Sequence, residues 1–139
     1  MLPERRPKTI PIVAAFLFAA TAVSVTVGVS LMVRGAFSDW LWSLNRPAEA
    51  SFRKLGSISS VLLLALGIAT FAGALGLLQR RKWAWWLAVV LFAINGGGDI
   101  VSLAVTGDWL RSVSGTVICS VFLYSLCRDP VRLYFRSET

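Results

Sequence analysis

Four long apolar runs constrain the fold of this chain more than any other feature of the sequence. They cover approximately residues 10–33, 57–79, 83–107 and 109–127. A helix needs about 20 predominantly apolar residues to cross the hydrocarbon core of a bilayer, and a backbone in lipid must satisfy its hydrogen bonds internally. The sequence therefore predicts an all-α integral membrane protein, an antiparallel bundle of four transmembrane helices in a single domain over 1–139. The fourth run is only about 19 residues long and carries Arg111 near its start, so it has the least support as a span.

The composition supports this class. Hydrophobic residues make up 56% of the 139 residues and charged residues only 15%. A soluble domain of this size needs a more polar surface than that balance allows. The first run also follows a basic start and contains a small-residue pattern at Ala20–Ala22, as a signal peptide does. It continues to Val33, however, so we expect it to be the first transmembrane helix.

The distribution of basic residues predicts the orientation. Nine of the 14 Lys and Arg residues flank the spans on the side that would hold both termini, and five lie on the other side. The positive-inside rule then places the N- and C-termini in the cytoplasm. The net charge of +7 is explained by this arrangement, so the expected partner is the lipid bilayer and not nucleic acid. The nine residues are Arg5, Arg6, Lys8, Arg80, Arg81, Lys82, Arg128, Arg132 and Arg136.

The inventory of reactive side chains argues against catalysis. The chain has no histidine and only two cysteines, Cys119 and Cys127, which are eight residues apart on one predicted helix and so about 12 Å apart. That separation is too long for a disulfide between them. We therefore expect no metal, no cofactor and no catalytic residues, and a protein that is not an enzyme.

The segment 34–56 is the only long connection. Trp40 and Trp42 favour the headgroup level, so we expect a short amphipathic segment along the outer surface after the first span. Pro47 is a suitable first residue for the next helix, and span two could begin there and project above the membrane. At the other end, the chain is expected to leave the membrane at Asp129–Pro130.

Small residues at four-residue spacing predict where helices meet. Span one has Ala20, Ser24 and Gly28 on one face, and span two has Ala65, Ala69 and Gly73. Close backbone approach drives helix association in lipid. These stripes predict packing seams inside one bundle, while a homodimer interface is the alternative.

A polar stripe in span three is the main functional candidate. Asn95, Asp99 and Ser102 are spaced four and three residues apart and so share a helix face. An acid near mid-membrane costs about 2.5–3.5 kcal/mol on insertion scales, and it usually faces a bundle interior and a partner. Arg111 at the start of span four is the expected ion-pair partner. Asp99 is then either functional or only salt-bridged, and the sequence does not separate the two.

The glycines Gly96, Gly97 and Gly98 have two interpretations. They could remove side chains so that another helix can touch span three. Alternatively the helix could loosen there and line a small polar cavity, as in discontinuous transporter helices. We favour the packing interpretation, because glycine is common in transmembrane helices.

The stretch GLLQRRKWAWWLAVVLFAINGGGDIVSLAVTGDW, together with YSLCRDPVRLYF, resembles a loosely defined group of small bacterial four-span membrane proteins of unknown function. The similar features are the basic–Trp turn, the Asn and Gly-Asp of span three and the basic–aromatic tail, over roughly residues 76–135. The resemblance implies a location in the bacterial inner membrane and implies no activity.

Three functions remain open at this stage. The first is a non-enzymatic accessory or structural subunit that works through protein or lipid contacts, as a homo-oligomer or with a membrane partner protein. The second is a small oligomeric transporter or channel that uses Asp99 as a proton or cation site. The third, a membrane enzyme, has the least support because the reactive residues are so few.

Overall fold

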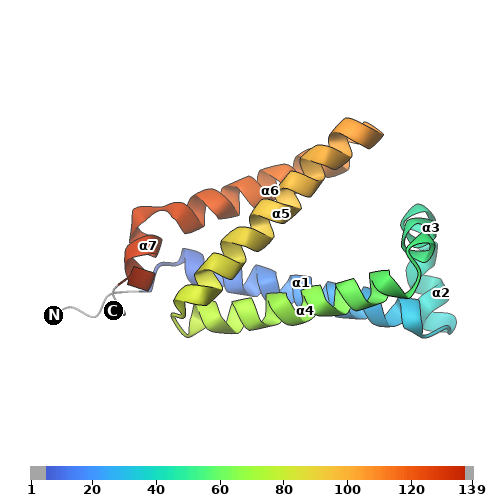
Figure 1. Ribbon diagram of the computed structural model, residues 1–139, viewed down its shortest axis with the longest axis horizontal. Helices are drawn as coiled ribbons and strands as arrows, with labels where there is room; N and C mark the ends of the chain where they lie inside the picture. The colour runs from blue at the N-terminus through green and yellow to red at the C-terminus, as the bar shows by residue number, and fades with distance from the viewer. Residues whose placement is uncertain (1–5, 137–139) are drawn as a thin grey trace. The chain divides into compact units, whose positions relative to one another are not determined.

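The computed structural model describes residues 6–136, apart from the side chain of Thr106, and this part of the chain is all α-helical (Figure 1). Arg5, one of the basic residues expected on the cytoplasmic side, lies outside the described residues. In chain order the helices are α1 Thr9–Met32, α2 Ala36–Ser43, α3 Arg46–Lys54, α4 Ser57–Leu78, α5 Lys82–Thr106, α6 Trp109–Cys127 and α7 Asp129–Arg136.

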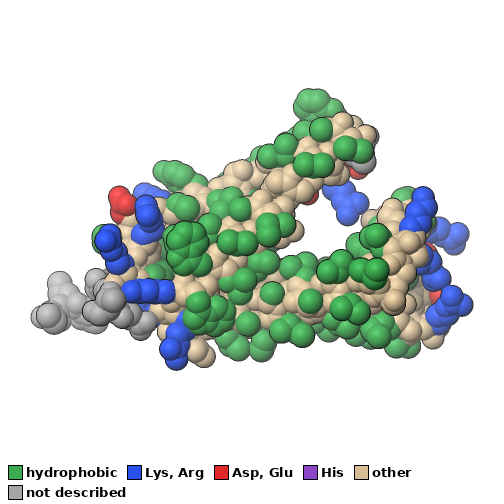
Figure 2. Space-filling model, viewed as in Figure 1, with side chains coloured by type: hydrophobic (Ala, Val, Ile, Leu, Met, Phe, Trp, Pro, Cys, Tyr) green, Lys and Arg blue, Asp and Glu red, His purple; other side chains and the backbone are tan. Residues whose placement is uncertain are grey.

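Four of these helices, α1, α4, α5 and α6, are long and apolar enough to cross a membrane. Their bounds agree with the predicted spans to within a few residues, and the long helices pack antiparallel in pairs, α1 with α4 and α5 with α6. The predicted four-span helical fold is therefore confirmed. On the face shown in Figure 2, hydrophobic side chains lie along the long helices, while Lys and Arg gather around α7 and around the short helices α2 and α3.

The chain divides into two compact units. One unit comprises Phe16–Phe71, and we call it the α1–α4 unit because those helices form most of it. The other comprises Met1–Ala15 with Ala72–Thr139, and we call it the α5–α6 unit. Each is described by itself below, and the organisation into a single domain stays a prediction.

Small residues let α1 and α4 approach closely within the α1–α4 unit. A Cβ added at Gly67 would lie 2.8 Å from Val25 Cγ2, and one added at Gly28 would lie 3.2 Å from Leu64. The hydroxyls of Thr21 and Thr70 are joined by a hydrogen bond of 2.8 Å across the same contact. In lipid, helices are held together by interhelical hydrogen bonds and by the van der Waals packing that close backbone approach allows.

The connection between α1 and α4 forms two short helices, and span two does not begin at residue 47 as one continuous helix. Asn45 caps α3 by accepting a hydrogen bond from the Ala48 amide at 3.2 Å. The helix then breaks at Gly56, whose φ of +61° is left-handed. The Ser59 hydroxyl lies 2.9 and 2.7 Å from the carbonyl oxygens of Phe52 and Gly56, which already accept the backbone amides of Leu55 and Ser59, and so it links α4 to the end of α3.

In the α5–α6 unit, a tight turn joins the end of α4 to α5. Gly76 lies so close to Ala84 that an added Cβ would overlap the alanine methyl group. Arg80 has a φ of +59°, which reverses the chain. Its guanidinium donates a hydrogen bond to the Tyr134 carbonyl at 3.0 Å and stacks on the Tyr134 ring, 3.9 Å from the ring centre. The turn is therefore held against α7.

α7 is an amphipathic helix at the end of α6. Val131, Tyr134 and Phe135 are buried, whereas Arg132 and Arg136 are exposed. The indole N–H of Trp85 in α5 donates to the Leu126 carbonyl at 3.0 Å, next to the start of α7. The chain after Asp129–Pro130, where it is predicted to leave the membrane, forms this helix and packs against α5.

Candidate functional site

The three consecutive glycines lie inside an unbroken helix. α5 runs from Lys82 to Thr106 without interruption, so the alternative in which the helix loosens at Gly96–Gly98 is not what the structure adopts. Its end is set at Gly107, whose φ of +68° forms a left-handed cap and whose amide donates to the Leu103 carbonyl. The polar residues of α5 are therefore held at fixed helical positions.

Asp99 points at the neighbouring helix. Its carboxylate lies directly against Gly115 of α6, where any Cβ would overlap the carboxylate oxygens. Asp99 is half-buried by this contact. The absence of a side chain at Gly115 thus creates the space that the carboxylate fills.

A second glycine extends the same contact. A Cβ at Gly96 would lie 3.2 Å from the Cβ of Cys119, and both residues are buried. By contrast, a Cβ at Gly97 or Gly98 would meet no atom within 4 Å. Only one of the three glycines is therefore required for the packing of α5 on α6.

Asn95 and Ser102 flank Asp99 along the helix but are exposed. The Asn95 side-chain amide donates to the Leu91 carbonyl of its own helix at 2.9 Å. This hydrogen bond uses one of the two N–H donors of the amide, so the second N–H and the side-chain carbonyl can bind other partners.

Arg111 does not reach Asp99 in this structure. Arg111 is exposed on α6, one turn before Gly115, and among the described side chains no ion pair joins it to Asp99. One helical turn is about 5.4 Å, which an arginine side chain can span. The pairing of Asp99 with Arg111 stays a prediction.

The predicted packing residues occupy different environments. Ser24 and Gly28 of α1 are buried, and Ala20 is half-buried. In α4, Gly73 is buried and Ala69 is half-buried. Ala65, which the spacing placed on the same stripe, is exposed, and Gly67 lies against α1 instead.

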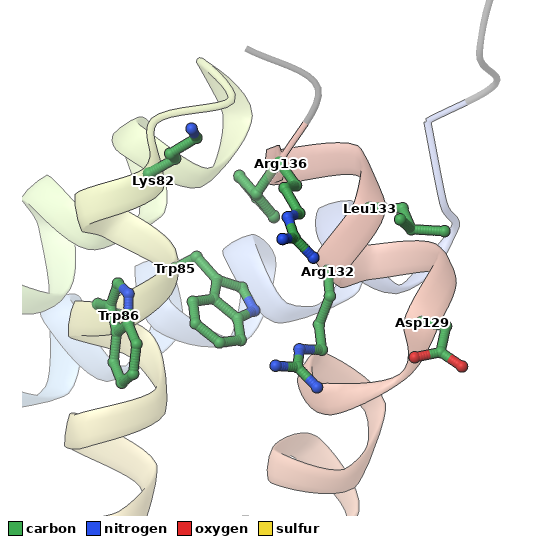
Figure 3. Close-up of a pocket in the computed structure, with 8 residues that line it drawn as sticks. Lys82, Trp85, Trp86, Asp129, Arg132, Leu133 and Arg136 are labelled. Carbon is green, nitrogen blue, oxygen red and sulfur yellow. The ribbon is translucent and has the colours of Figure 1, made fainter. Parts of the chain in front are cut away.

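A cavity that the sequence analysis missed lies between α5 and α7. It has a volume of about 510 Å³ and is bounded by basic, aromatic and apolar side chains (Figure 3). Trp85 from α5 and Arg132 and Arg136 from α7 point into the space between the two helices. The amphipathic pattern of DPVRLYFR could have predicted a helix there, but the cavity depends on how that helix docks. The lining residues are Lys82, Trp85, Trp86, Asp129, Arg132, Leu133, Phe135 and Arg136.

Comparisons of this chain with protein families, with curated proteins and with solved structures find no match. The resemblance of residues 76–135 to small bacterial four-span proteins therefore identifies no family. The fold alone defines the class, which is a small multi-pass membrane protein built of four candidate transmembrane helices.

Proposed function

We propose that this protein is a non-enzymatic accessory subunit that works through contacts with other transmembrane helices in a bacterial inner membrane. The observation that carries the proposal is a polar face on α5 formed by Asn95, Gly98 and Ser102, which we call the polar flank. These residues are spaced three and four apart and so lie on one side of the helix. Asn95 and Ser102 are exposed, and nothing lies within 4 Å of a Cβ at Gly98.

Lipid provides no hydrogen-bond partners for the side chains of the polar flank. Lipid tails cannot hydrogen-bond an amide or a hydroxyl, so an exposed Asn95 is more stable against a neighbouring helix than against acyl chains. Gly98 lets the backbone of that neighbour approach closely. A second copy of the chain or a different membrane protein would satisfy both needs.

Photo-cross-linking in native membranes tests this proposal. A photoreactive amino acid replaces Gly98 in the polar flank or, as the matched control, Gly97. The two glycines are adjacent and equally uncovered, but they lie about 100° apart around the helix axis. We expect adducts with a second polypeptide from position 98 and mostly lipid adducts from position 97.

Two results would contradict the proposal. Equal yields of protein adducts from positions 97 and 98 would show that the polar flank has no special partner. Adducts formed only within one chain would show that the flank packs against the protein's own helices. The mass of each adduct separates these cases.

A transporter or channel that uses Asp99 as a proton or cation site is the second candidate. The observation that favours it is a half-buried carboxylate in mid-helix with no cationic partner among the described residues. Asp99→Asn should then preserve the helix content and abolish pH-dependent flux into liposomes. Liposomes with the unaltered protein that show no flux above empty ones would exclude this candidate.

We also propose that both termini lie in the cytoplasm. The support is the unequal distribution of basic residues, nine on the side of the termini and five on the other. This orientation would place the α4–α5 turn and α7 at the cytoplasmic surface.

A further inference from the structure

The cavity between α5 and α7 combines positive charge with tryptophan. Three cationic side chains line it, Lys82 from α5 and Arg132 and Arg136 from α7, against one carboxylate, Asp129. Figure 3 shows Asp129 projecting from the start of α7, while Arg132 and Arg136 extend toward Trp85. The excess of cations favours an anionic ligand.

The position of the cavity at the ends of two candidate spans indicates the kind of anion that can reach it. Lys82 and Trp85 lie in the first turn of one predicted span, and α7 begins directly after the end of another. Tryptophan concentrates at the headgroup level of a bilayer, and Lys and Arg beside spans attract anionic lipids. The cavity is thus at the depth where lipid phosphates lie.

The cavity walls are built from fixed elements. Trp85 is held by the bond of its indole N–H to the Leu126 carbonyl, and Phe135 is buried on the inner side of α7. The Arg80 guanidinium, bonded to the Tyr134 carbonyl, ties α7 to the α4–α5 turn. The two arginines therefore project from a docked helix, and less backbone freedom is lost when a ligand binds.

We propose that this cavity binds a phosphate group, carried by an anionic phospholipid or present as a free phosphate. Arg132 and Arg136 donate hydrogen bonds to the phosphate oxygens, a geometry that the guanidinium group matches well. Lys82 adds charge from the opposite wall. For a lipid ligand, Trp85 and Trp86 contact the glycerol and the upper acyl chains. The proposal does not depend on the polar flank of α5.

Binding to the full-length protein in a non-ionic detergent tests the proposal. The probes are short-chain dihexanoyl phosphatidylglycerol, dihexanoyl phosphatidylcholine and inorganic phosphate, measured by microscale thermophoresis at one ionic strength. We expect phosphatidylglycerol to bind more tightly than phosphatidylcholine, whose choline cation is repelled by the lining arginines. Inorganic phosphate that binds as tightly as phosphatidylglycerol would assign the site to a free phosphate.

Charge-removing variants locate the binding. The double variant Arg132→Gln/Arg136→Gln should weaken phosphatidylglycerol binding about thirtyfold, since each cation near an anionic surface contributes a factor of about five. The matched control is Arg81→Gln, a neighbouring arginine that does not line the cavity. It should change binding by less than about twofold, because screening weakens charges outside the site.

Two outcomes would overturn the proposal. One is an equal loss in Arg81→Gln and in the single variant Arg132→Gln, which would indicate diffuse attraction to a basic surface. The other is the absence of saturable binding of any of the three probes to the unaltered protein. If the double variant loses helix content by circular dichroism, Lys82→Gln on the α5 wall replaces it, with the same expected direction and a loss of about fivefold.

Discussion

The Asp99 carboxylate fits against α6 because residue 115 of that helix is a glycine and has no side chain. The carboxylate occupies the position that a side chain at residue 115 would take. A carboxylate in the hydrocarbon region is costly unless it turns toward protein or water, so a glycine opposite the acid stabilises the inward orientation. The glycine in α6 is therefore as important to this arrangement as the acid in α5.

A mutant cycle between these two residues tests that relationship. Gly115→Ala should lower the stability of the protein, because the new methyl group forces the carboxylate away from α6. In an Asp99→Ser background the same change should be neutral or stabilising, since alanine is a better helix former than glycine by about 1 kcal/mol. The expected coupling is roughly 0.5–3 kcal/mol, measured by reversible unfolding in mixed detergent micelles. An identical effect of Gly115→Ala in both backgrounds would show that the contact has no energetic consequence.

The sequence predicted the polar helix face of the candidate site but not the contact of Asp99 with α6. The spacing of Asn95, Asp99 and Ser102 predicts a polar helix face, because helical periodicity is a local property. The contact with Gly115 could not be predicted, since the rotation of α6 about its own axis is set by tertiary packing. The expected partner, Arg111, lies only one turn away on the same stripe of α6 as Gly115.

At the scale of elements, the α4–α5 hairpin depends on a close contact. Gly76 and Ala84 approach so closely that no side chain fits at position 76. The hydrogen bond from the Arg81 amide to the Gly76 carbonyl, at 2.8 Å, fixes the turn that brings them together. We therefore expect the stability of the α5–α6 unit to fall when a larger side chain is introduced at position 76.

The same substitution at two glycines tests the hairpin. Gly76→Ala should destabilise the protein by about 1–3 kcal/mol, because overpacking forces the two helices apart. Gly97→Ala should be neutral or slightly stabilising, since a Cβ there meets nothing within 4 Å. Thermal melting of the helical circular dichroism signal in detergent compares the two variants. Equal melting temperatures would contradict the hairpin geometry.

The long helices could be predicted from sequence, and so could a short helix after the first span and a helix start at Pro47, whereas the break before α4 and the docking of α7 could not. Apolar length alone predicts a span, because lipid allows few other backbone conformations. The break at Gly56 is held by hydrogen bonds from the Ser59 hydroxyl to two carbonyl oxygens, and these bonds can form only once the chain has turned. The docking of α7 depends on a bond from Arg80 to the Tyr134 carbonyl, 54 residues away, which no local pattern reveals.

At the scale of the whole molecule, the orientation in the membrane decides what each surface meets. If both termini lie in the cytoplasm, as proposed, the cavity between α5 and α7 would face the cytoplasmic leaflet, where anionic lipids attract basic segments. The short helices α2 and α3, on which Trp40 is exposed, would then lie at the outer surface. The two surfaces would meet different headgroups and different proteins.

Cysteine labelling tests this orientation with a natural reporter. Cys127 is exposed at the end of α6, and Cys119 is buried and can be changed to serine. A membrane-impermeant maleimide should label Cys127 in inverted vesicles and not in intact spheroplasts. A Ser43→Cys variant without Cys127 should show the reverse. Labelling of Cys127 from outside would contradict the proposed orientation.

Site-directed spin labelling in lipid vesicles tests whether α5 lies in hydrocarbon with Asp99 turned toward α6. Nitroxides are attached at Asp99→Cys or at Val101→Cys, an exposed position on the same helix, with Cys119 and Cys127 changed to serine. We expect lower collision rates with oxygen at position 99 than at position 101, and low rates with a water-soluble nickel chelate at both. Equal oxygen accessibility at the two positions would contradict the inward orientation of Asp99. High accessibility to the nickel chelate at both would contradict the placement of α5 in the bilayer.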